Sequence, residues 1–168
     1  MTENNSDPDY DMGVLEWSLC ILLVGIVAVT FAQVLSRYVF QASLAWSEEL
    51  ARYLFMWLAS LGAAYAFKTR SHFLLRFVVD KFSVKLQMVV STLVVALMTI
   101  FLVTFIWQAI LYTESVAGQI GPGTGLSKAV PVSSAVVGGL LMLFYMVRNW
   151  IDEVRIYREH TSGYRSHG

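Results

Sequence analysis

Charged residues are scarce in this sequence, and they gather in clusters. Only 14% of the 168 residues are Asp, Glu, Lys or Arg, whereas a soluble domain carries about a quarter. Hydrophobic residues make up 57% of the chain, the mean hydropathy is +0.59, and the apolar residues fall in long blocks. This pattern excludes an ordinary soluble domain and predicts membrane-spanning helices of about 20 residues each.

Cysteine and histidine are absent from the places where cofactor chemistry would need them. Cys20 is the one cysteine, so no disulfide framework, zinc site or Cys-x-x-Cys pair can form. The histidines, His72, His160 and His167, lie outside the apolar blocks, whereas a haem-bearing membrane subunit needs them within its spans. The net charge is zero, which indicates no attraction to nucleic acid. We expect no cofactor, no metal and no enzymatic activity.

Four apolar blocks predict four spans, at roughly 13–36, 44–67, 82–113 and 131–150. The predicted fold is an all-α integral membrane protein, a bundle of four transmembrane helices that forms a single domain over 1–168. Because the N-terminus lacks the basic region of a secretory signal, we expect the first block to be a retained span. The two ends, about 1–11 and 160–168, are expected to be disordered.

Basic residues predict the orientation of these spans. They follow the second span and the fourth span, at Lys68, Arg70, Arg76, Lys81 and Lys85, and at Arg148, Arg155, Arg158 and Arg165. The positive-inside rule places both segments in the cytoplasm, so both termini are expected there. The turn at 37–49 and the glycine-rich loop at 118–125 then face outward. The linker at 72–82 fits either a short interfacial helix or a solvated connector.

The segment 46–57 places two carboxylates and an arginine at the start of the second span. Charge beside lipid is costly unless a partner, a headgroup or water compensates it. Glu48 and Arg52 are four residues apart, so they share a helix face and can pair. Small side chains beneath them favour close approach of another helix. Trp46, Tyr53 and Trp57 form an aromatic strip typical of an interfacial anchor.

Arg37 ends the first span a short turn away, where it can reach Glu48 or Glu49 across the hairpin. The candidate site is therefore an interface for a partner subunit or a phospholipid headgroup, formed by Arg37, Trp46, Glu48, Glu49, Arg52 and Trp57. The alternative is a capping cluster that only fixes the turn. Ion or substrate coupling is disfavoured, since it usually needs ionisable groups near mid-membrane and no span has one at its centre.

Three other features receive structural interpretations. Glu16 is interpreted as an ordinary helix start. Gly138 and Gly139 are interpreted as a site of close helix packing. The 118–125 loop contains several glycines and Pro122, and we interpret it as a plain loop in preference to a surface for an external protein.

The residues from Arg37 to Ala64 also carry a resemblance. Arg37 to Phe40, the segment 43–57 and Gly62 to Ala64 resemble the small four-helix membrane subunit, the Q-type subunit, of tripartite ATP-independent periplasmic (TRAP) transporters. The resemblance implies a place in the bacterial inner membrane. It also implies two protein partners: a large multi-helix membrane subunit that carries the sodium and substrate sites and works as an elevator, and a periplasmic substrate-binding protein. The substrate would be an organic acid, such as a C4-dicarboxylate or a sialic acid. The small subunit would scaffold the large subunit and would not bind the substrate itself.

Two other functions stay open on the sequence. A self-sufficient small exporter that works as a homo-oligomer needs a membrane-embedded carboxylate, and the candidates are Glu16 and the pair Glu48 and Glu49, all near span ends. A membrane enzyme or electron carrier is disfavoured because cysteine pairs and histidines within spans are lacking.

Overall fold

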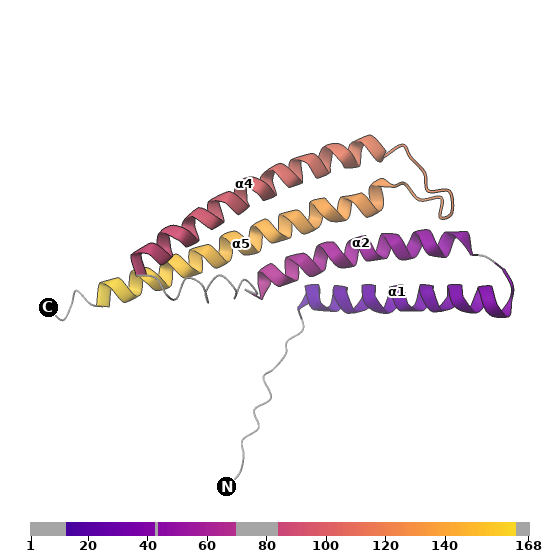
Figure 1. Cartoon of the computed structure of the whole chain (residues 1–168), viewed down its shortest axis with the longest axis horizontal. Coiled ribbons are helices and arrows are strands. Elements are labelled where there is room, and N and C mark those ends of the chain that lie inside the picture. Colours follow the sequence, from indigo (N-terminus) through magenta and orange to yellow (C-terminus); the bar gives the residue numbers. More distant parts are fainter. Residues whose placement is uncertain (1–12, 43, 70–83, 164–168) are drawn as a thin grey trace, which may run out of the picture.

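Four long helices make up most of the protein. The structure, a computed structural model, describes residues 13–42, 44–69 and 84–163. Its helices are α1 (Val14–Val39), α2 (Ala45–Lys68), α4 (Val84–Val116) and α5 (Ala129–Gly163) (Figure 1). Each contains a stretch long and apolar enough to cross a membrane. The predicted all-α membrane fold with four spans is confirmed, while the orientation of its termini stays a prediction.

Two helices are longer than a span requires. α5 has 35 residues, or about 50 Å at 1.5 Å per residue, against a hydrocarbon core of about 30 Å. Its candidate span is Ala129–Asp152, and that of α4 is Thr92–Val116. Because α5 continues to Gly163, residues 160–163 are helical, although we expected them in a disordered end. The other expected disordered residues and the 72–82 linker lie outside the described residues.

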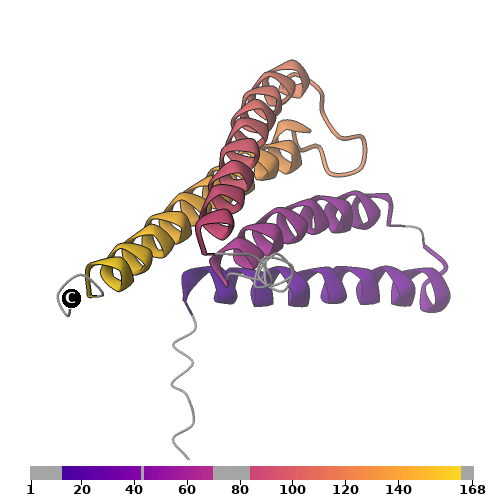
Figure 2. The same cartoon turned by 60° about the vertical axis from the view of Figure 1, so that its left-hand side comes forward.

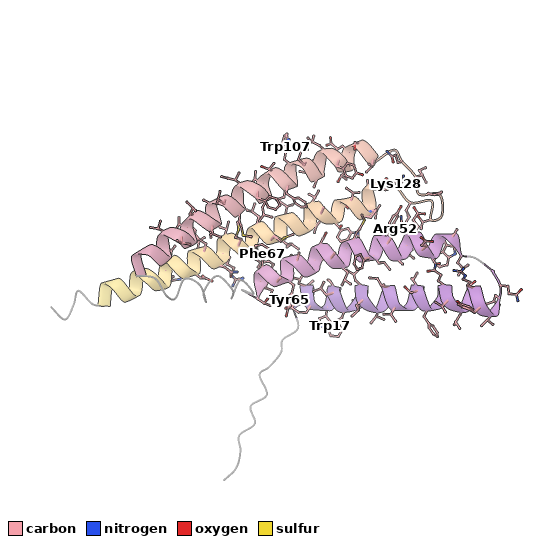
Figure 3. The ribbon with its side chains drawn as sticks, viewed as in Figure 1. Trp17, Arg52, Tyr65, Phe67, Trp107 and Lys128 are labelled. Atoms are coloured by element: carbon pink, nitrogen blue, oxygen red, sulfur yellow. The ribbon has the colours of Figure 1, made fainter. Side chains whose placement is uncertain are left out.

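The four helices form an open row. α2 packs on α1 and on α5, and α5 packs on α4, so the order across the row is α1–α2–α5–α4 (Figure 1). Figure 2 shows the α4–α5 hairpin inclined to the α1–α2 hairpin. The edge helices α1 and α4 expose apolar side chains on their outer sides, for example Trp17 and Trp107 (Figure 3). Such surfaces suit lipid or a partner, since neither leaves them in water.

Close backbone approach holds α5 in the middle of this row. A Cβ atom added at Gly138 would lie 2.8 Å from the Cβ atom of Ser60 on α2, and one at Gly139 would lie 2.8 Å from Cγ1 of Ile106 on α4. The predicted close packing at this glycine pair is confirmed. Beside it, the Ser60 hydroxyl donates to the Ser134 hydroxyl at 3.3 Å. Small residues therefore let α5 contact both of its neighbours.

The C-terminal end of α2 is tied to both neighbouring helices. The Lys68 ammonium lies 2.6 Å from the Glu16 carboxylate of α1, and the two side chains are 36% and 21% exposed. The Asn149 side-chain amide of α5 donates to the Phe67 carbonyl at 2.8 Å. Glu16 lies in the first turn of α1 as we expected of a helix start, and its carboxylate also binds Lys68, 52 residues away.

Candidate functional site

The turn between α1 and α2 is held by two buried serines. The Ser36 hydroxyl donates to the Ala42 carbonyl at 2.9 Å, and the Ser47 hydroxyl donates to the Leu44 carbonyl at 2.7 Å. Leu44, at the N-cap of α2, makes no side-chain capping bond. Gln41 adopts a positive φ of 51°, which permits the sharp change of direction. Among the described residues of the turn, these bonds involve no charged side chain.

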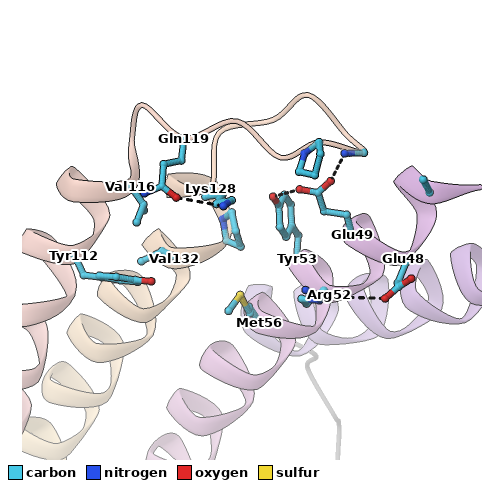
Figure 4. A pocket seen from close by; sticks show the side chains of 14 residues that line it. Glu48, Glu49, Arg52, Tyr53, Met56, Tyr112, Val116, Gln119, Lys128 and Val132 are labelled. Carbon is cyan, nitrogen blue, oxygen red and sulfur yellow. Dashed lines mark hydrogen bonds and ion pairs between the residues drawn. The ribbon is translucent and has the colours of Figure 1, made fainter.

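Glu49 turns away from the helix start and binds the loop between α4 and α5. Its Oε2 atom accepts the backbone amides of Gly123 at 2.8 Å and Thr124 at 2.9 Å. Its Oε1 atom accepts the Tyr53 hydroxyl at 2.5 Å. Figure 4 shows the carboxylate between the tyrosine and the loop. Hydrogen bonds to a charged acceptor are stronger than neutral ones, so Glu49 fastens the loop to α2.

The loop is shaped to receive this carboxylate. Its two arms are joined by two backbone hydrogen bonds. The Gly121 amide donates to the Leu126 carbonyl at 2.8 Å, and the Lys128 amide donates to the Gln119 carbonyl at 2.9 Å. Gly121 contacts Glu49 so closely that a Cβ atom would overlap the carboxylate, and a Cβ atom at Gly123 would lie 2.9 Å from the Ala45 carbonyl oxygen. The segment is a loop, as we expected, with one isolated β-bridge between Ile120 and Ser127, and it is docked on α2 through Glu49.

Glu48 and Arg52 form the ion pair that their spacing predicts, with a nitrogen–oxygen distance of 3.3 Å. The prediction is confirmed, but the side chains are 70% and 66% exposed, so the pair adds little stability. Arg37 is exposed and pairs with neither carboxylate among the described residues. Our expectation that it reaches Glu48 or Glu49 is wrong, because Glu49 points to the loop and Glu48 to Arg52.

The three aromatic residues of the segment do not form one anchoring strip. Trp46 is exposed, whereas Tyr53 is 8% exposed and bonded to Glu49. The Trp57 indole donates to the Val130 carbonyl of α5 at 3.2 Å. Tyr53 is thus part of the loop clamp, which consists of the Glu49 carboxylate and its donors Tyr53, Gly123 and Thr124. The four-residue spacing between Glu49 and Tyr53 could have revealed their bond. The candidate residues divide into an exposed set and an inward set that joins the two hairpins.

A cavity of about 560 Å³ opens beside this clamp, between the start of α2, the end of α4, the loop and the start of α5 (Figure 4). Its lining includes Glu48, Arg52, Met56, Tyr112, Gln119 and Lys128. Lys128 donates to the Gln119 side-chain carbonyl at 3.2 Å. In the part of the chain that the structure describes, no three His, Cys, Asp or Glu side chains gather as metal ligands. The cavity therefore offers charge and hydrogen bonds for binding.

Four helices long and apolar enough to span a membrane, joined at one end by a loop that is bonded to Glu49, define a multi-pass membrane protein. Comparison with known families agrees with this class. Residues 26–156 match the family described as tripartite ATP-independent periplasmic transporters, DctQ component. The match covers well over half of the chain, so the chain belongs to this family. It is the small permease subunit of a TRAP transporter and a multi-pass protein of the inner membrane.

Three relatives show how the chain compares in length. A putative TRAP transporter small permease protein of Haemophilus influenzae Rd is 26% identical over 137 residues, which cover 81% of this chain and 85% of that protein. The sialic acid TRAP transporter permease protein SiaT of H. influenzae 86-028NP is 29% identical over 133 residues, but the match spans 79% of this chain and only 22% of SiaT. The isethionate TRAP transporter permease protein DctMQ of Oleidesulfovibrio alaskensis is 26% identical over 160 residues, 86% of this chain and 25% of DctMQ.

Proposed function

We propose that this small permease subunit is a non-catalytic scaffold for a large elevator-type permease subunit, during sodium-driven uptake of an organic acid delivered by a periplasmic binding protein. The main observation in support is that every carboxylate at the ends of α1 and α2 is engaged within the chain. Glu16 pairs with Lys68, Glu48 with Arg52, and Glu49 with the loop. A small exporter would need one of these carboxylates for coupling; Glu16 and Glu49 are bonded inside the chain, and Glu48 lies exposed at a helix end in a weak pair, which disfavours the alternative function.

Ties at both ends of α2 support the scaffold role. Glu49 joins α2 to the α4–α5 loop at one end, and Asn149 joins α5 to Phe67 at the other. With Gly138 packed on Ser60 between them, α2 and α5 are held at three levels. An elevator moves one domain against a wall that stays fixed, and a row of helices fastened in this way resists bending.

The lengths of the relatives support a large companion subunit. In SiaT and DctMQ the region that matches this chain is about a quarter of the protein or less, so it belongs there to a much longer permease polypeptide. We infer that this chain meets an equivalent companion as a separate subunit. One of these relatives is named for sialic acid and the other for isethionate, so the substrate of the assembled transporter is proposed only as an organic acid.

We propose that the exposed face of α2 binds this companion, with Glu48 and Arg52 at its charged end, and that the exposed side chains of Trp46 and of Arg37, at the end of α1, contribute beside it. Along this face Phe55 is 61% exposed, Ala59 is exposed, and nothing lies within 4 Å of a Cβ atom added at Gly62. Small residues exposed to the bilayer let a second helix approach closely. Glu49 and Trp57 act indirectly, because they hold the loop and α5 in place.

Steric blocking tests this assignment. Ala59→Trp on the exposed face of α2 should reduce both co-purification of the large subunit and sodium-driven uptake by the reconstituted three-component system. Leu97→Trp, on the exposed apolar face of the edge helix α4, is the matched control and should leave both unchanged. Full uptake by the large subunit and binding protein without this chain would disprove the scaffold role, as would uptake by this chain alone.

A further inference from the structure

The cavity beside the loop clamp lies at the level of the helix ends. It is lined by the first turns of α2 and α5, the last turns of α4, and the loop between α4 and α5. Helix ends of membrane spans lie at the headgroup level of the bilayer. Its volume of about 560 Å³ is in the usual range for a small-molecule site, so a ligand of headgroup size fits.

Two cations line the cavity and can bind an anionic group, Arg52 and Lys128. Glu49 lines it, but the carboxylate is bonded to Tyr53 and to the amides of Gly123 and Thr124. The lining therefore carries two carboxylates, Glu48 and Glu49, and two cations, Arg52 and Lys128, and of these four groups the two cations supply N–H donors for a ligand. A guanidinium has five N–H donors and an ammonium has three. Among the described residues Arg52 donates to Glu48 and Lys128 donates to Gln119, which leaves further donors for a ligand.

Apolar side chains continue the cavity toward the membrane interior. Met56 lies one turn beyond Arg52 on α2, and Val132 lies one turn beyond Lys128 on α5; both line the same cavity (Figure 4). A ligand that meets cations at the helix ends and apolar walls one turn deeper is amphiphilic, with an anionic head and a hydrocarbon tail. Inorganic phosphate satisfies only the first of these conditions.

We propose that this cavity is a phospholipid site, in which the headgroup phosphate binds between Arg52 and Lys128 and an acyl chain follows Met56 and Val132. The site connects the α1–α2 hairpin with the α4–α5 hairpin, since Arg52 lies on α2 and Lys128 lies in the α4–α5 loop directly before α5. A bound lipid joins the two hairpins beside the Glu49 clamp. The proposal is independent of whether the exposed face of α2 binds the large subunit.

The test is native mass spectrometry of the delipidated transporter complex, titrated with phosphatidylglycerol of one acyl length. We expect one tightly bound lipid, and about fivefold weaker binding in Lys128→Gln, the factor typical of one basic side chain near an anionic surface. Met56→Trp, which fills the cavity without changing charge, should also weaken binding. The matched control is Arg148→Gln, which removes an exposed cation near the opposite end of the candidate span Ala129–Asp152 and should bind lipid as the wild type does.

The proposal would be overturned by unchanged binding in both Lys128→Gln and Met56→Trp, by equal losses in Lys128→Gln and Arg148→Gln, or by equal binding of diacylglycerol, which has no phosphate. Displacement of the lipid by millimolar inorganic phosphate would show a simple anion site and would also overturn it. The large subunit is weighed in the same spectra, so loss of the complex is distinguished from loss of the lipid.

Discussion

The carboxylate of Glu49 accepts the backbone amide of Gly123 at 2.8 Å, across 74 positions of sequence. This bond joins the start of α2 to the loop that leads into α5, and so it connects the two hairpins of the protein at one face of the membrane. Because Thr124 and Tyr53 donate to the same carboxylate, one side chain organises the loop.

The Glu49 clamp predicts a specific loss of order in the loop. Glu49→Ala removes the acceptor of two amides and a hydroxyl, which should lower the unfolding temperature by about 3 °C or more. Hydrogen exchange at 119–126 should become faster. Glu48→Ala is the control, because it removes a neighbouring carboxylate with only an exposed partner, and it should change neither measurement. Equal effects of the two variants would contradict the clamp.

Gly121 predicts a steric requirement in the same place. Gly121→Ala puts a methyl group where the Glu49 carboxylate lies, so the loop must move away from α2. Hydrogen exchange in the loop should increase as it does for Glu49→Ala. Gly118→Ala, in the same loop with nothing within 4 Å of the added carbon, should behave as the wild type. A normal exchange pattern in Gly121→Ala would show that the loop does not dock as described.

The contact between α2 and α5 predicts that Gly138 tolerates no side chain. In Gly138→Ala the new methyl group would meet the Ser60 Cβ atom at 2.8 Å and its carbonyl oxygen at 2.9 Å, and overpacking of this kind costs about 1–3 kcal/mol. Thermal unfolding in detergent measures the loss. Gly62→Ala on the open side of α2 makes the same chemical change without a clash and should not destabilise the protein.

The ion pair between Glu16 and Lys68 predicts a coupling between α1 and α2. Because both side chains are partly buried and 2.6 Å apart, a double-mutant cycle with Glu16→Gln and Lys68→Met should show a larger coupling in unfolding temperature than the same cycle at Glu48 and Arg52. The exchanged pair, Glu16→Lys with Lys68→Glu, should recover stability that each single reversal loses. Independent, additive effects at Glu16 and Lys68 would argue against the pair.

Much of the fold was predictable because hydropathy and helix periodicity are local properties. Runs of apolar residues predict the four spans, and the four-residue spacing of Glu48 and Arg52 predicts their ion pair. The glycine pair at 138 and 139 indicates close packing without naming the neighbours. Each of these needs only the geometry of one helix.

The candidate site was predicted less completely. The segment 46–57 was identified from its charge, but its residues were assigned to one interface, whereas Glu49 and Trp57 contact the other hairpin and Arg37 pairs with neither carboxylate in the described chain. Lys128 and the loop glycines were missed, because nothing in their sequence neighbourhood shows that α2 lies beside them. A side chain that points away from its own helix can contact several neighbouring elements, and the residue pattern within one helix does not indicate which of them it contacts.

The sequence alone determined that this is a four-span membrane protein with its charges at the ends of the helices, because transfer of apolar residues into lipid depends on composition and length. The tertiary structure decided the row order α1–α2–α5–α4, the partner of Glu16 and the docking of the loop on Glu49. These depend on which backbones approach closely enough for small residues and amides to meet, and residues more than 50 positions apart meet only when the chain is folded.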